Sequence, residues 1–215
     1  MYRILTRKHK PDIAIDLGTA NTRIMTAAEG IVFDEPSLCC FSGDSGRKKL
    51  VAAGLEARKM RGHDSADLTI IRPLSYGVLN DIDAARIFLG YAIRSSIGKL
   101  PRGGVTATIG VPTDATSAER NALMTAARDA GISSVTLVDE TIAAAHGAGI
   151  EIDGPTGAMV VECGAGVTEA VVLSLGGLCG RVAIRKGGDS MDQSIMDHLH
   201  FKHKFLIGQN MAEQT

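Results

Sequence analysis

The sequence predicts an α/β fold in which mixed sheets are flanked by helices. One short frame of apolar, acidic and glycine residues occurs twice, at residues 15–22 and again at 161–168. Strand-like and helix-like segments alternate from Val105 onward, which is typical of a sheet covered by helices. A composition of 45% hydrophobic and 22% charged residues is that of a globular protein able to bury a core. A chain of 215 residues fits one large domain or two small ones.

The two copies of the frame align residue by residue. The corresponding pairs are Asp16 and Glu162, Gly18 and Gly164, and Thr22 and Thr168. Apolar runs precede and follow each copy. Each copy therefore predicts a buried strand, a tight glycine turn and a second strand, which together form a hairpin.

A glycine turn of this kind can bind an anion. Glycine allows close backbone approach, so successive N–H groups can converge on a phosphate. A carboxylate at the end of the preceding strand is placed to hold Mg²⁺ through water, because Mg²⁺ favours one or two carboxylates together with waters and phosphate oxygens. Two facing hairpins would clamp the phosphates of a nucleotide between two half-domains. The other interpretation is a pair of ordinary hairpins, and the matching frames favour the clamp.

The chain between the two frames predicts a small subdomain followed by a helix. A third strand is expected at residues 30–33, and residues 34 to about 73 read as a small subdomain or insertion with short strands and one helix at 55–61. Apolar residues at helical spacing predict a helix over 83–97, with Asp81 or Asp83 as its cap. The loop at 98–104 carries cations beside apolar residues. A plain surface loop is preferred there over a membrane contact.

Two further strand–helix units precede the second hairpin. Residues 105–111 predict a buried strand, and Thr116 and Glu119 form a capping box that begins a helix reaching Ala130. Residues 134–138 predict another strand, and an Ala-rich helix is expected at 141–147. Glu140 stands between these two elements. It either orients an attacking water molecule or acts as an N-terminal acid that interacts with the helix dipole, and the sequence leaves both roles open.

The last third of the chain predicts one more strand and one more helix. The strand is expected at residues 178–184, after a Gly-Gly turn. The helix is expected from about residue 190 to 205. Ile195, Met196 and Leu199 recur at helical spacing in it, so they are expected to face the core.

Composition excludes several classes of protein. A net charge of −1 gives no overall field for nucleic acid, and the absence of Trp leaves few stacking platforms for single strands, so no nucleic-acid partner is expected. No apolar run approaches the roughly 18 residues of a membrane span. The four cysteines show no C-x-x-C spacing, which favours reduced, buried thiols in a cytoplasmic protein. These cysteines are Cys39, Cys40, Cys163 and Cys179.

The first ten residues have a character of their own. They run from Met1 to Lys10 and combine four Lys or Arg residues with an apolar set of Met1, Tyr2, Ile4 and Leu5, and Pro11 follows them. One interpretation is a short basic amphipathic anchor for an anionic membrane surface. The other is a frayed, solubilising N-terminus. Both interpretations stay open at this stage.

Taken together, these motifs resemble the MreB family of bacterial actins, through almost the whole chain after the first ten residues. The resemblance rests on residues 15–22, 30–37, 54–60, 71–78, 111–120 and 139–145. It implies an actin-like (ribonuclease H-like) fold with two half-domains around a nucleotide cleft. The first half-domain would span residues 11–146. Residues 147–215 would form the start of the second half-domain, which would be incomplete.

The resemblance also implies a function and a set of site residues. It implies an ATP-binding cytoskeletal filament protein that uses Mg²⁺, lies beneath the cytoplasmic membrane and takes part in cell shape. Asp16 and Glu162 would act on Mg²⁺ through water, and Glu140 would position the hydrolytic water. The residues that would cradle the phosphates are Gly18, Thr19, Ala20, Asn21, Gly164, Ala165, Gly166, Val167 and Thr168.

Two departures from the family pattern bear on hydrolysis. Glu162 and Ala165 stand where the family usually has aspartate and glycine, and the longer Glu162 side chain shifts the metal geometry by about an ångström. Family members also continue well beyond the point that matches Gln209, so uncovered core surface and association are expected. These departures weaken the expectation of an actin-type ATPase. The alternatives are a non-hydrolysing interaction protein that co-assembles with a full-length actin-like filament, or a specialised, magnetosome-type filament protein.

Overall fold

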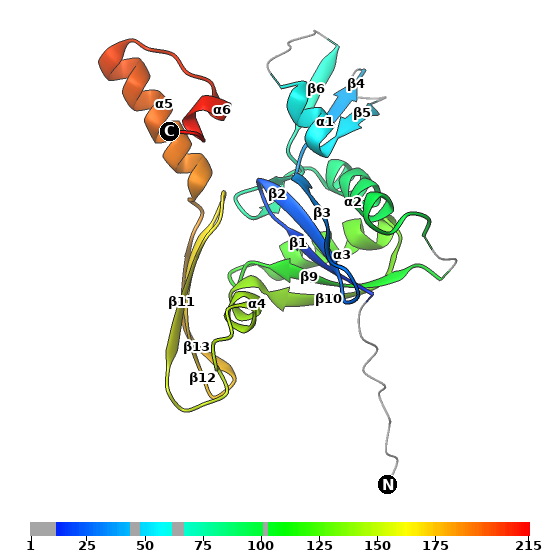
Figure 1. Cartoon of the computed structure of the whole chain (residues 1–215), viewed down its shortest axis with the longest axis vertical. Coiled ribbons are helices and arrows are strands. Elements are labelled where there is room, and N and C mark those ends of the chain that lie inside the picture. The colour runs from blue at the N-terminus through cyan, green and yellow to red at the C-terminus, as the bar shows by residue number, and fades with distance from the viewer. Residues whose placement is uncertain (1–11, 44–47, 62–66, 101–102) are drawn as a thin grey trace.

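A computed structural model describes residues 12–43, 48–61, 67–100 and 103–215 of the chain (Figure 1). The predicted membrane anchor at residues 1–10 lies outside the described residues. Within the described residues, no helix is long and apolar enough to cross a membrane.

The first part of the chain is built on a five-stranded mixed sheet. The strand order is β10-β9-β1-β2-β3. β1 pairs antiparallel with β2 and parallel with β9, which in turn pairs parallel with β10. The mixed sheet confirms the predicted fold class. Its strands are β1 (Ile13–Leu17), β2 (Asn21–Thr26), β3 (Gly30–Pro36), β9 (Val105–Val111) and β10 (Ile132–Asp139).

Two helices cover this sheet and begin where the sequence predicts. In α2 (Ile82–Ile97), the Asp81 side chain accepts from the Ala84 N–H at 2.9 Å, which identifies Asp81 as the cap. In α3 (Ser117–Asp129), both hydrogen bonds of the Thr116–Glu119 capping box are present. Each satisfied cap supplies partners for backbone N–H groups that the first helical turn leaves unpaired. Fully buried residues of both helices join one apolar core with the sheet.

A smaller antiparallel sheet forms beside β3, with the order β5-β4-β6. It contains β4 (Cys39–Ser42), β5 (Lys49–Ala53) and β6 (Leu68–Ile71), and α1 (Gly54–Lys59) packs on it. Leu38, Cys40 and Ala57 form a separate small core there. The expected short strands and single helix of this region are therefore present. The short hairpin of β7 (Leu74–Ser75) and β8 (Val78–Leu79) was not predicted.

The second part of the chain contains a three-stranded antiparallel sheet. Helix α4 (Glu140–Gly147) leads into β11 (Ala158–Cys163), β12 (Thr168–Ser174) and β13 (Gly177–Ile184). One face of this sheet packs on α4 through Val171, Leu173, Ala145 and Ile152. The strand register places every second residue of each strand on the opposite face of the sheet. The apolar side chains on that face are exposed. They are Met159, Val161, Val172, Val182 and Ile184.

Two predictions about burial in this second part are wrong. No residue of α5 (Gly188–His203) is fully buried, so Ile195, Met196 and Leu199 do not face a closed core. Among the described residues, α5 packs mainly against the short α6 (Gln209–Ala212). Cys163 and Cys179 are exposed, whereas Cys39 and Cys40 are buried as expected. Cys163 is the last residue of β11 and lies on its exposed face, and Cys179 lies on β13, an edge strand.

Candidate functional site

The two glycine turns have the same internal hydrogen bond. In the first turn the Gly18 N–H donates to the Asn21 carbonyl at 3.1 Å, and in the second the Gly164 N–H donates to the Val167 carbonyl at 2.8 Å. A Cβ atom on Gly18 would lie 2.7 Å from the Asn21 oxygen, closer than side-chain carbons approach. The repeated sequence frame thus folds into the same turn twice, and glycine is needed at Gly18.

The two turns lie against one another, although they come from different sheets. A Cβ atom on Gly166 would lie 2.7 Å from the Thr19 hydroxyl oxygen and 2.8 Å from the Tyr76 Cα. Thr19 also accepts from the Gly77 N–H at 3.0 Å. The unpredicted β7–β8 hairpin therefore holds the first turn against the second.

One cavity of about 510 Å³ opens between the turns. All predicted site residues except Thr168 line it, and these are Asp16, Gly18, Thr19, Ala20, Asn21, Glu140, Glu162, Gly164, Ala165, Gly166 and Val167. Thr168 lies at the start of β12, and its hydroxyl donates to the Lys186 carbonyl at 2.8 Å. Residues 146 positions apart in the sequence, such as Asp16 and Glu162, thus meet at one site. We call this space the phosphate cavity.

Two carboxylates at the strand ends face this cavity. Burial raises the pKa of Asp16, and the neighbouring Arg23 partly offsets this effect. The Arg23 Nη1 atom lies 3.2 Å from Asp16 Oδ2, and the Arg23 Nε atom lies 3.2 Å from Asp34 Oδ2. Burial also raises the pKa of Glu162, and the negative charges of Glu169 and Asp16 raise it further. The buried Glu162 Oε2 atom has no hydrogen-bond partner among the described residues.

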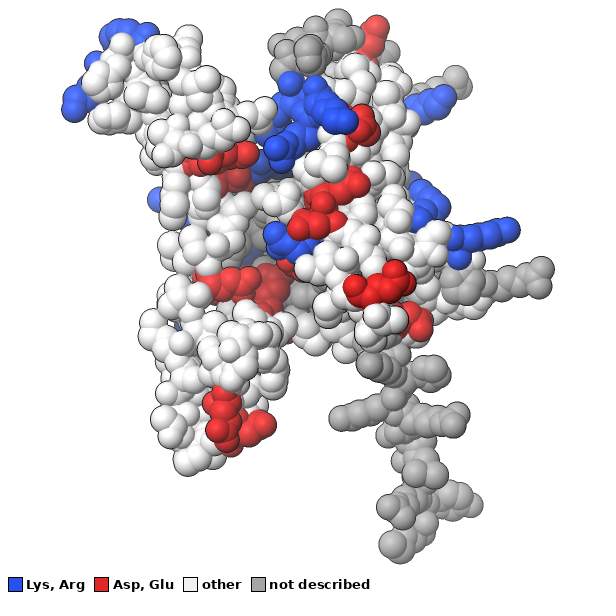
Figure 2. All heavy atoms as spheres, viewed as in Figure 1, with Lys and Arg blue, Asp and Glu red and all other residues white. Residues whose placement is uncertain are grey.

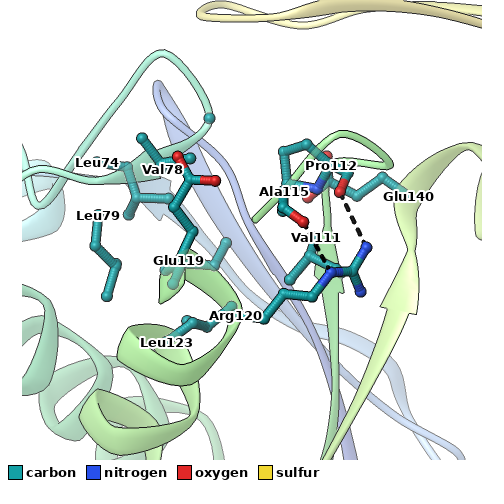
Figure 3. A pocket seen from close by; sticks show the side chains of 13 residues that line it. Leu74, Val78, Leu79, Val111, Pro112, Ala115, Glu119, Arg120, Leu123 and Glu140 are labelled. Carbon is teal, nitrogen blue, oxygen red and sulfur yellow. Dashed lines mark hydrogen bonds between the residues drawn. The ribbon is translucent and has the colours of Figure 1, made fainter. Parts of the chain in front are cut away.

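Glu140 lies at the junction of β10 and α4, between the phosphate cavity and a smaller apolar pocket. Figure 3 shows this smaller pocket, in which Glu140 lies next to Pro112 and across from Leu74 and Leu79. Burial raises the pKa of Glu140 to about 8, and the negative charges of Glu162, Asp16, Glu169 and Asp139 add to this. A carboxyl group with so high a pKa is protonated at neutral pH until a cation or another positive group approaches it.

Arg120 fixes the backbone around this pocket. Its guanidinium donates to the Ala115 carbonyl at 3.2 Å and to the Pro112 carbonyl at 3.4 Å, as the dashed lines in Figure 3 show. It also donates to Asp139 at 2.7 Å. The residue before Glu140 is therefore held by a charge-assisted hydrogen bond.

Sequence reasoning missed Glu169, which also lines the cavity. Its carboxylate is fully buried and accepts from the Thr113 N–H at 2.9 Å and from the Thr113 hydroxyl at 2.5 Å. The Arg181 guanidinium donates to the Thr113 carbonyl. Two residues of the β11–β13 sheet thus hold the segment that follows β9. The sequence did contain one signal, because Glu169 is an acidic residue inside an otherwise apolar strand. A buried acid usually has a hydrogen-bond or ion-pair partner, so such a residue is expected to make a specific contact.

Replacing Glu169 by alanine is expected to lower the free energy of unfolding by about 3 kcal/mol, because a buried N–H and a buried hydroxyl of Thr113 lose their acceptor. Urea unfolding measures this loss. Glu169→Gln is the control, because its amide oxygen can still accept both hydrogen bonds. Equal losses in the two variants would show that the charge matters more than the contacts.

Within the described parts of the chain, no group of three or more His, Cys, Asp and Glu side chains is close enough to coordinate a metal ion. The acidic cavity and the Glu162 Oε2 atom, which has no hydrogen-bond partner in the described part of the chain, nevertheless suit a cation held at a distance. Such an arrangement matches the preference of Mg²⁺ for keeping several of its waters.

Comparison with known proteins assigns the chain to a family. The family model described as MreB/Mbl protein matches residues 10–215 of the chain. The chain belongs to the MreB/Mbl family. The match covers both glycine turns, the small sheet beside β3, and the helices α5 and α6.

Curated MreB/Mbl relatives agree with this assignment. The chain is 39% identical over 202 residues to the cell shape-determining protein Mbl of Bacillus cereus, covering 94% of this chain and 60% of that protein. It is 38% identical over 206 residues to the cell shape-determining protein MreB of Escherichia coli, covering 94% of this chain and 59% of that protein. The chain therefore spans about 60% of the length of these relatives.

Solved structures confirm the actin-like fold. MreB 5 of Spiroplasma citri bound to AMPPNP has a TM-score of 0.86 and 31% identity, over 96% of this chain and 62% of that chain. The MamK double helical filament has a TM-score of 0.76 and 26% identity, over 94% of this chain and 62% of that chain. The MreB/Mbl likeness is thus stronger than the likeness to MamK.

Proposed function

We propose that this chain is part of an ATP-binding bacterial actin that forms filaments and contributes to cell shape. The observation that carries the proposal is the pair of matching turns, which face each other across one cavity with the same Gly N–H to carbonyl hydrogen bond. A likeness to MreB 5 of Spiroplasma citri, whose structures are described as bound to AMPPNP and to ADP, supports nucleotide binding.

Each site residue has a role in this proposal. The turns at residues 18–21 and 164–168 would cradle the phosphates through backbone N–H groups other than those of Gly18 and Gly164, which close the turns, because oriented amides stabilise anions. Asp16 and Glu162 would hold Mg²⁺ through its waters, and the bound ion would neutralise the phosphate charge. Glu140 would orient the water that attacks the terminal phosphate. Its raised pKa fits this role only once a cation lowers it.

The relatives support a proposal for the cellular setting. Both curated relatives are named as cell shape-determining proteins, and MamK is described as a double helical filament. We infer a cytoplasmic, self-assembling protein with half-domains at about 11–146 and 147–215. Attachment to the inner face of the cytoplasmic membrane through residues 1–10 belongs to this proposal as well.

A non-hydrolysing protein that co-assembles with a longer actin-like partner is the second candidate. The side chain of Glu162 favours it, because its buried Oε2 atom accepts no hydrogen bond from any residue that the structure describes. If the Glu162 carboxylate is not held in a fixed position, nucleotide can still bind, but hydrolysis is slower because the reacting groups are less well positioned.

The test is titration calorimetry of the 215-residue chain with ATP, with Mg²⁺ and with EDTA, followed by phosphate-release and pelleting assays. Saturable binding that needs Mg²⁺ is the expected result. Phosphate release would favour the actin ATPase, and pelleting only with a longer relative would favour the co-assembling protein. A chain that circular dichroism shows to be folded, yet that binds no ATP, would overturn the proposal.

A further inference from the structure

The phosphate cavity itself has an unfavourable charge for a polyphosphate. Its described lining contains the carboxyl groups of Asp16, Glu162 and Glu169, the protonated carboxyl group of Glu140 and the single guanidinium of Arg23. Arg23 is already paired with Asp16 and Asp34. Beyond the charge of a bound Mg²⁺, a nucleoside triphosphate must therefore find its positive counter-charge outside this lining.

An adjoining cavity of about 220 Å³ has arginines on one wall. It shares Ala20, Asn21, Ala165 and Gly188 with the phosphate cavity, so the two cavities adjoin each other. The arginines are Arg58 in α1, Arg61 just after α1, and Arg72 just after β6. Figure 2 shows Lys and Arg atoms gathered in the hollow between the lobe that carries α1 and the lobe formed by α5 and α6.

The three arginines differ in their partners. Arg72 forms a part-buried salt bridge with Asp189 at 2.6 Å. Arg58 and Arg61 form no salt bridge within the described ranges of the chain, although both line the cavity. Burial lowers the pKa of the Arg61 guanidinium, the positive charge of Arg72 lowers it further, and Glu213 and Asp189 act in the opposite direction. A bound anion would stabilise Arg61 in this position.

The opposite wall limits where an anion can lie. Asp192 and Glu213, from α5 and the residue after α6, line the same cavity and repel phosphate groups. Neither lies within salt-bridge distance of Arg58 or Arg61 in the part of the chain that the structure describes. An anion would therefore approach along the α1 wall.

We propose that Arg58 and Arg61 form an anion-capturing rim that draws the phosphate groups of a nucleoside triphosphate toward the two glycine turns. The proposal rests on the proposed nucleotide binding and adds two residues outside the turns to it. Surface charges of this kind act mainly on the association rate, and salt screens them. The dissociation rate depends on contacts in the phosphate cavity and changes little.

Stopped-flow mixing with a fluorescent Mg²⁺-ATP analogue at low and high salt tests the rim. In the double variant Arg58→Gln/Arg61→Gln, the association rate at low salt is expected to fall about tenfold, with a shallower dependence on salt. Glu213→Gln removes a repelling charge and is expected to raise the association rate. Arg128→Gln is the matched control, because Arg128 is exposed on α3 and lines neither cavity. Binding of inorganic tripolyphosphate, measured in parallel, reports on the phosphates without the nucleoside.

The outcomes separate this inference from the proposed function. If the wild-type chain binds Mg²⁺-ATP and the double variant associates as fast as wild type, the rim is wrong and nucleotide binding stands. An equal loss in Arg128→Gln, or an effect on dissociation alone, also overturns it. If the folded wild-type chain binds neither ligand, both inferences fail. A slower association in the double variant together with a faster one in Glu213→Gln supports the rim.

Discussion

Replacing Gly18 by valine is expected to weaken Mg²⁺-ATP binding by about 100-fold or more. The new Cβ would lie 2.7 Å from the Asn21 carbonyl oxygen, so the hydrogen bond that closes the first turn must break. Each lost hydrogen bond from an N–H group to a phosphate costs about 1.5–3 kcal/mol, and the turn would lose at least two. Titration calorimetry measures the change.

A graded series makes this prediction sharper. Gly180→Val is the matched control, because a Cβ at Gly180 meets nothing within 4 Å and valine suits a strand. Gly164→Ala should weaken binding less than Gly18→Ala, since its Cβ would lie 3.3 Å from the Val167 oxygen. Near-equal affinities for Gly18→Val and Gly180→Val would refute a phosphate role for the first turn.

Replacing Glu140 by glutamine is expected to change how stability depends on pH. The pKa of Glu140 is about 8 in the folded chain, against an ordinary value of 4.5. Between these values the folded state holds a proton that the unfolded state has released, so the free energy of unfolding falls as pH rises, by up to about 1.4 kcal/mol per pH unit. Glutamine removes this contribution.

Urea unfolding from pH 4.5 to pH 8 measures the effect. The variant and the wild type should be similar near pH 4.5, and by pH 8 the variant should be more stable by about 4 kcal/mol. Glu29→Gln, a change at an exposed carboxyl, is the control and should leave the pH dependence unchanged. Parallel curves for wild type and Glu140→Gln would show that Glu140 ionises normally in the folded chain.

Local patterns in the sequence predicted most of the fold. The capping box at Thr116, the cap at Asp81 and the strand at 105–111 depend on residues close together in the chain, and all three are confirmed. The burial of α5 was not predictable in this way. Its apolar spacing indicates a side that can be buried, whereas its actual burial depends on which other elements pack against it.

The candidate site was predictable where the sequence repeats itself. The two glycine frames identify both turns, because the same residues at the same spacing fold into the same hydrogen bond. Glu169, Arg61 and the β7–β8 hairpin belong to no repeat. Their importance comes from contacts with residues tens of positions away, such as Glu169 with Thr113, and a single sequence does not contain that information.

The sparse junction between the two main sheets has a consequence for amide hydrogen exchange. Side-chain hydrogen bonds from Glu169, Arg181 and Arg185 link the β11–β13 sheet to the first part of the chain, and Asp189 of α5 adds a bond to Arg72, while the apolar side chains on the other face of the sheet are exposed. Amides of β12 should therefore exchange through local opening, faster than those of β9 in the main core. A ligand that binds both turns at once would act as a crosslink, and protection of β12 should then rise with ligand concentration toward that of β9.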